Sequence, residues 1–173
     1  MAGIFDKLNN APAPTGGGYY FKPGEYEFEV VAVKELTTRG GEDAFVVDTR
    51  VITSNNSDFP EGAQPSIYQG CSGAQADIGP ITVKSFLAAC LGLDAHNKRD
   101  AEAIGRVDWK KVGMIATSSD NPFEGFRVHT TVFPKTTKKG KEIDVHKFTP
   151  SKNPTDFQKQ LAEDLRSGKM KAK

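Results

Sequence analysis

The chain contains little cysteine and histidine, and it has no long apolar run. Its 173 residues include 2 cysteines and 3 histidines, and none of them stands in a CxxC or HExxH spacing. A disulfide framework, a zinc site and a thiol redox motif are therefore poorly supported. No segment approaches the ~20 consecutive apolar residues of a membrane-spanning helix, and MAGIFDKLNN lacks the apolar core of a signal peptide. We expect a cytoplasmic protein that does not bind membranes.

The sequence also lacks the motifs of common enzyme classes. The glycines of APAPTGGG are followed by neither the helix nor the Lys-Ser/Thr of a phosphate-binding loop. Asp43, Asp48 and Asp58 would need to converge to hold Mg²⁺, and two of them lie in predicted loops. No Ser/His/Asp order rises above chance. We therefore predict a protein that is not an enzyme and that uses no cofactor or metal.

The net charge is only +1, yet two parts of the chain differ in sign. Residues 1–134 hold 12 Lys and Arg against 17 Asp and Glu, a net charge of −5. Residues 135–173 hold 11 against 5, a net charge of +6. A basic end on an acidic body is consistent with a nucleic-acid partner, although basic ends also occur on proteins that bind nothing anionic.

The first third of the chain predicts three strands. Residues 25–36 alternate apolar side chains with glutamates, and residues 44–53 continue the alternation after a Gly-Gly turn, which predicts a hairpin. Residues 63–70 predict a third, shorter strand, placed at an edge because it contains a proline.

The remaining segments predict helices and further strands. Residues 80–94 are typical of a helix, residues 100–112 of a short helix or turn, and residues 112–119 of a short apolar strand. Residues 126–133 and 143–148 predict strands on either side of a lysine-rich tip. Phe157, Leu161 and Leu165 recur every four residues between Pro154 and Gly168, which predicts an amphipathic helix that packs back on the domain.

This order of elements predicts a mainly β fold with helices. The order β–β–β–α–β–β is that of a five-stranded OB-fold barrel, here with an additional β-hairpin arm and a C-terminal helix. The predicted parts are an N-terminal lead-in at 1–24, an OB-fold domain with the lysine-rich arm at 25–150, and a helix with a basic tail at 151–173.

Over residues 24–150 the chain resembles the small single-stranded DNA-binding proteins of bacteriophages. The similar segments are GEYEFEVVAVKELTTRGGEDAFVVDTRVITS, ITVKSFLAACLGLD, GRVDWKKVGMIATSS and FRVHTTVFPKTTKKGKEIDVHKFTP. The resemblance implies sequence-independent binding of single-stranded DNA in phage replication or recombination, in the host cytoplasm. Replication or recombination proteins are then expected partners, but this chain ends in RSGKMKAK where many of that group carry an acidic recruiting tail.

Binding of a single strand requires cations along the phosphates and flat side chains on which bases stack. Tyr68 and Phe123 are candidates for stacking, with packing in the core or its rim as the alternative. The candidate phosphate ligands are Arg39, Arg50, Arg127, Lys135, Lys138, Lys139 and Lys141.

Two alternatives stay open. A lysine-rich tip also protects an edge hairpin from aggregation. The acidic body favours a structural or adaptor module that binds a protein partner through its C-terminal helix and aromatic rim. The sequence does not establish the oligomeric state, so a homo-oligomer stays open. It also does not establish a preference for DNA over RNA.

Overall fold

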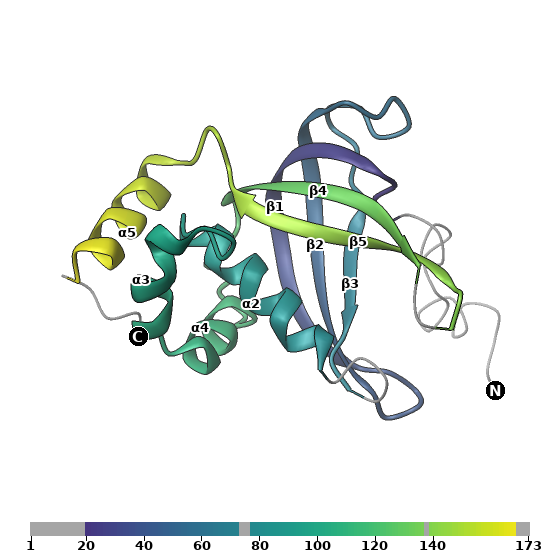
Figure 1. Ribbon diagram of the computed structural model, residues 1–173, viewed down its shortest axis with the longest axis horizontal. Helices are drawn as coiled ribbons and strands as arrows, with labels where there is room; N and C mark the ends of the chain where they lie inside the picture. The colour runs from purple at the N-terminus through teal and green to yellow at the C-terminus, as the bar shows by residue number, and fades with distance from the viewer. Residues whose placement is uncertain (1–19, 73–76, 137–138, 169–173) are drawn as a thin grey trace, which may run out of the picture.

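The computed structural model describes residues 20–72, 77–136 and 139–168. In these residues, five antiparallel strands form one open sheet in the order β3-β2-β1-β4-β5, and four α-helices accompany it (Figure 1). The strands are β1 Gly24–Thr37, β2 Asp43–Ser54, β3 Ser66–Gly70, β4 Arg127–Thr136 and β5 Glu142–Pro150. The helices are α2 Ile78–Cys90, α3 Ala101–Arg106, α4 Trp109–Ala116 and α5 Asp156–Ser167, with a 3₁₀ turn at Lys98–Asp100. The fold is therefore mixed α/β.

The first three strands form where the sequence alternates, which confirms their prediction. On β1 the side chains of Tyr26, Phe28 and Val30 are buried, because they share one face of the strand. The register of β1 with β2 shifts between Val30 and Ala32. Such irregularities bend a strand and increase its twist, which helps this sheet to curve.

The predicted strand at residues 112–119 is wrong, and this changes the role of the predicted arm. Val112 belongs to α4, which begins after Asp108, whose side chain accepts a hydrogen bond from Lys111 N at 3.2 Å. Val112 and Ala116, four residues apart, are the buried positions of α4. A short apolar run has no period that separates helix from strand. The β4–β5 hairpin is consequently part of the five-stranded sheet and not an addition to it.

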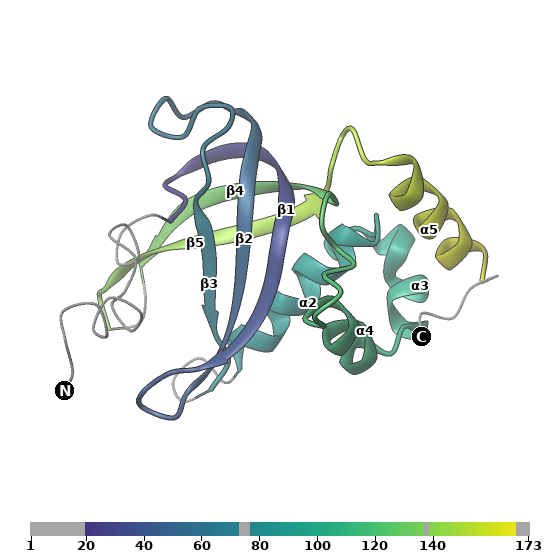
Figure 2. The same cartoon turned by 180° about the vertical axis from the view of Figure 1, so that it is seen from behind.

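The expected barrel is not closed. Within the described residues, the edge strands β3 and β5 are not hydrogen-bonded to each other. Helix α2 packs against β3, β4 and β5, so it contacts both edges of the sheet. Figures 1 and 2 show the curved sheet with α2 across one end and with α3, α4 and α5 beyond it.

The core lies between one face of the sheet and α2, and aromatic rings connect its parts. The ring of Phe86 contacts those of Phe45 and Phe148, with centroids 5.7 and 5.4 Å apart. Phe148 stacks on His146 at 5.0 Å, and Phe21 meets His146 edge-on at 5.4 Å. Burial lowers the pKa of His146 to about 4, so its imidazole is neutral at pH 7.

Residues at both ends of the chain's described part pack on this core. Phe21, within the predicted lead-in, is 3% exposed. Leu165 of α5, within the predicted C-terminal part, is also 3% exposed. The division of the chain at residues 24 and 150 stays a prediction.

Candidate nucleic-acid interface

The lysine-rich tip joins β4 to β5. Lys135 lies on β4 opposite Ile143, Lys139 and Lys141 lie in the turn, and all three lysines are exposed. Gly140 has a φ of +80°, a conformation that residues with a Cβ rarely adopt. The turn therefore requires glycine here and holds lysines on both sides of it. Lys138 lies outside the described residues.

One face of this hairpin adds an aromatic ring and a lysine that the sequence prediction missed. Phe133 is 42% exposed and shares a face of β4 with Lys135. On β5, Val145 is opposite Phe133, and the exposed Lys147 follows two residues later on the same face. The alternation of the two segments was visible in the sequence. The strand register was needed to show that both alternations meet on one surface.

Arg39 lies at the tip of the β1–β2 hairpin and is exposed. Backbone hydrogen bonds from Thr38 N to Glu42 O and from Gly41 N to Thr38 O close this turn, at 2.8 and 2.9 Å. In Figure 1 this turn extends from the lower end of the sheet, whereas the β4–β5 tip extends to the right. Arg39 is thus accessible, but no contact within the described residues joins it to the lysines.

Arg50 and Arg127 flank the same glutamate from the two strands that pair with β1. Glu29 is opposite Arg50 on β2 and opposite Arg127 on β4. Arg50 Nε lies 3.1 Å from Glu29 Oε1, and Arg127 Nη1 donates a hydrogen bond to Asn153 O at 3.0 Å. Both guanidinium groups therefore have partners within the protein, which makes each of them a weak candidate for binding a phosphate.

Tyr68 and Phe123 have opposite environments. Tyr68 is 46% exposed on the edge strand β3, opposite Val46. Phe123 is 5% exposed, and its ring stacks on Phe126 with centroids 4.8 Å apart. Phe123 therefore packs in the core, which is the alternative that the sequence left open for it, and it offers no free ring face to a base.

Helix α5 is fixed to the sheet by a buried glutamine. Gln158 is 1% exposed and forms a capping box with Thr155 at the start of the helix. Its Oε1 accepts a hydrogen bond from Arg127 N, and its Nε2 donates to Arg127 O and to Cys90 O, each at 2.9 Å. The helix packs back on the domain as predicted, but largely through Gln158, Ala162 and Leu165, whereas Phe157 is 62% exposed.

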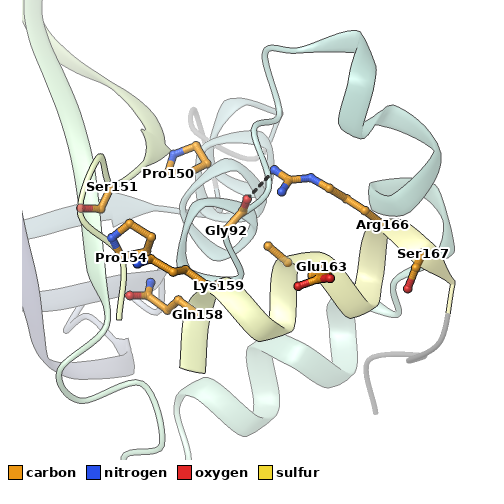
Figure 3. A pocket seen from close by; sticks show the side chains of 10 residues that line it. Gly92, Pro150, Ser151, Pro154, Gln158, Lys159, Glu163, Arg166 and Ser167 are labelled. Carbon is orange, nitrogen blue, oxygen red and sulfur yellow. Dashed lines mark hydrogen bonds between the residues drawn. The ribbon is translucent and has the colours of Figure 1, made fainter. Parts of the chain in front are cut away.

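A groove of about 680 Å³ runs beside α5 (Figure 3). Gly92 forms part of one wall and Arg166 part of the other, and Arg166 Nη2 donates a hydrogen bond to Gly92 O at 3.0 Å. Gly92 has a φ of +79°, and a Cβ at this position would lie 2.7 Å from Ala162 Cβ. The backbone of Gly92 and helix α5 therefore approach too closely for a larger residue.

Arg166, which lines this groove, also pairs with Asp100, which is fully buried. Arg166 Nε and Nη2 donate hydrogen bonds to Asp100 Oδ1 and Oδ2 at 2.8 and 3.1 Å, and Asp94 N donates to Oδ2 at 2.8 Å. Burial raises the pKa of Asp100, but these hydrogen bonds and the positive charge of Arg166 outweigh it and hold the pKa below its usual value. The polar groups here hold α5 in place.

Other chemistry has little support. Burial raises the pKa of the Cys90 thiol well above its usual value, and burial together with Asp43 and Glu35 raises that of Cys71. A thiol with a raised pKa is a poor nucleophile at neutral pH. Among the residues that the structure describes, no three His, Cys, Asp or Glu side chains gather as a metal ion would require. No helix in the described ranges is long and apolar enough to cross a bilayer.

Comparison with known proteins gives no family: no family model matches the chain, and no curated protein matches it. The function is therefore argued from the residues and their geometry.

Proposed function

We propose that the protein binds single-stranded DNA with little sequence preference, through its β4–β5 hairpin. The observation that carries this proposal is the exposed tip with Lys135, Lys139 and Lys141, next to the exposed ring of Phe133. Cations of this kind neutralise phosphates, and an aromatic ring stacks on any base, so both contacts tolerate all sequences. The resemblance to phage single-stranded DNA-binding proteins supports the same function, and we propose on that basis a role in phage replication or recombination.

The order of the strands supports an OB-fold. β4, β1, β2 and β3 lie side by side in the 4-1-2-3 order of a Greek key. The OB-fold is a five-stranded, partly open Greek-key barrel whose loops bind oligonucleotides. A helix between the third and fourth strands that contacts both sheet edges fits this fold. On this proposal the seam of the barrel lies between β3 and β5.

The alternative function, a module that binds a protein partner through its C-terminal helix, has less support. Of the three residues of the predicted apolar stripe, Leu165 is buried, Leu161 is partly buried against the core and Phe157 is largely exposed. The ring of Phe157 lies 5.9 Å from that of Phe126. Leu161 and Leu165 of the stripe thus pack within the domain.

Fluorescence anisotropy with a labelled dT oligonucleotide and a matched duplex, repeated over a salt series, tests the proposal. We expect binding to dT, weaker binding to the duplex and a steep loss of affinity with salt. The slope of log K against log salt is about −0.7 for each phosphate contacted on a single strand, so three lysine contacts give a slope of about −2. No dT binding at low salt, or a preference for the duplex, would contradict the proposal.

A further inference from the structure

The β4–β5 hairpin has two faces of different charge. Successive side chains of a strand point to opposite sides, so the strand register defines both faces. The outward face consists of Thr131, Phe133, Lys135, Ile143, Val145 and Lys147. The opposite face carries Glu142 and Asp144, across from Thr136 and Pro134, and continues toward the buried Val132 and Phe148. A polyanion therefore meets cations on the outward face and carboxylates on the other one.

Phe133 lies at the centre of the outward face. In the described part of the chain its ring stacks on no other ring, although it is 42% exposed. Lys135 is two residues further along β4, about 7 Å away at the 3.3 Å rise of a strand, and Lys147 is its diagonal neighbour on β5, about 7–8 Å away. Among the described residues neither lysine forms an ion pair. Among the described residues, the ring of Phe133 thus has on each side a lysine that forms no ion pair.

The neighbouring strand β1 limits how far a polyanion can extend across this surface. Glu25 is opposite Thr131 of the outward face, and Glu27 and Glu29 follow on the same side of β1. Glu27 accepts hydrogen bonds from Ser151 Oγ at 2.6 Å and from Lys152 N at 3.0 Å, which fix its carboxylate in place. β1 lies between the hairpin and the β2–β3 pair. Of these three carboxylates, Glu25 is exposed, Glu27 is buried and Glu29 pairs with Arg50 at 3.1 Å. The exposed carboxylate of Glu25 thus lies on the strand that separates the outward face from Tyr68.

We infer that single-stranded DNA follows the outward face of the β4–β5 hairpin, with one base stacked on Phe133 and phosphates near Lys135 and Lys147. The strand does not cross β1 to reach Tyr68. This inference rests on the proposed function and adds to it the surface, the path and the stacking residue. A duplex keeps the faces of its bases inside its own stack, so a single strand is the form that can place a base on Phe133.

Two exposed aromatics give a matched pair of variants, because Phe133 and Tyr68 are 42% and 46% exposed. We expect Phe133→Ala to weaken dT binding by about 5- to 150-fold, the effect of losing one base–aromatic stack, and Tyr68→Ala to change it by less than twofold. Thermal unfolding of both variants checks that they fold like the wild type. Equal dT affinity of Phe133→Ala and the wild type, or a larger loss for Tyr68→Ala, would overturn the inference.

A second readout reports the stack itself. In Phe133→Trp, dT should quench the fluorescence of the new indole, whereas in the wild type the one tryptophan, Trp109 on α4, should change little. No quenching beyond the wild-type change, despite dT binding, would overturn the stacking role. If the wild type fails to bind dT at all, the proposed function fails. If the wild type binds dT and Phe133→Ala binds equally well, only the inference fails.

Discussion

Charged residues have opposite roles in two regions of the molecule. One region is the helical end, which is formed by α3, α4 and α5 with the turn at Lys98–Asp100, and the other is the β4–β5 hairpin. At the helical end, the fully buried Asp100 lies 2.8 Å from Arg166 and 3.6 Å from Arg99. At the hairpin, Lys135 and Lys139 are exposed among other lysines. A buried carboxylate with its cation is part of the fold, whereas neighbouring like charges oppose folding, which fits the proposed binding of a polyanion. Variants at the two ends should therefore separate stability from binding.

The largest effect is expected at the helical end. Asp100→Ala removes the partner of Arg166 and the acceptor of Asp94 N. Breaking a fully buried pair costs about 3–5 kcal/mol of the free energy of unfolding, and we expect a loss at the lower end of this range because the Arg166 side chain is 35% exposed. Urea denaturation measures this loss. Arg99→Met is the control, because the Arg99 side chain is 66% exposed and an exposed pair contributes less than about 1 kcal/mol. Equal losses in the two variants would show that the buried pair does not hold α5.

A slightly smaller effect, on binding and not on stability, is expected at the hairpin. Replacing Lys135, Lys139 and Lys141 by Gln should weaken dT binding about 100-fold at 0.1 M salt and make the salt slope shallower by about 2. The control is the triple variant Lys98→Gln, Lys110→Gln and Lys111→Gln, which removes the same charge from exposed positions of the helical end. Similar losses in both triple variants would mean that net charge, and not the hairpin, carries the affinity.

Substitutions at two glycines test how closely the backbone of Gly92 approaches α5. Gly92→Ala should lower the free energy of unfolding by about 2 kcal/mol, because of its positive φ and the 2.7 Å approach to Ala162. Gly105→Ala is the matched change, since a Cβ at Gly105 meets nothing within 4 Å and alanine favours the helix by about 0.5–1 kcal/mol. Chemical denaturation should therefore give opposite signs for the two variants. The same sign in both would contradict the close approach of Gly92 to α5.

The smallest effect concerns the base of the hairpin, where His146 is packed in the core. Its pKa of about 4 in the folded protein lies below the 6.5 of an exposed histidine. The unfolded chain therefore binds a proton between these values that the folded protein does not, so stability falls as the pH drops from 6.5 toward 4. We expect a loss of about 1–2 kcal/mol between pH 7 and pH 5 from this group. Urea denaturation at both pH values should show a smaller loss in His146→Phe, and an unchanged loss would contradict the assignment.

Strong alternation made most of the sheet predictable from the sequence. Residues 25–36, 44–53 and 126–133 alternate over enough positions to fix their strands, and Pro154 and Gly168 bracket the last helix. Residues 112–119 were not predictable in the same way. Their first part is helical because Asp108 caps the N-terminus of α4 and because Val112 and Ala116 are buried one helical turn apart.

The candidate site was predictable only where it depends on local sequence. The lysines stand close together in the chain, so their shared tip was visible without a structure. The burial of Phe123 against Phe126 depends on tertiary packing, and so does the exposure of Phe133. The outward face also requires the pairing of Phe133 with Val145, which no property of either strand alone determines.

Amide hydrogen exchange of the full chain, with and without a dT oligonucleotide at low salt, tests most directly whether the hairpin is the binding surface. We predict slower exchange with dT in peptides from β4 and β5 between residues 131 and 147, and unchanged exchange in α5. Protection confined to α5 or β3, or no protection anywhere at saturating dT, would contradict the account.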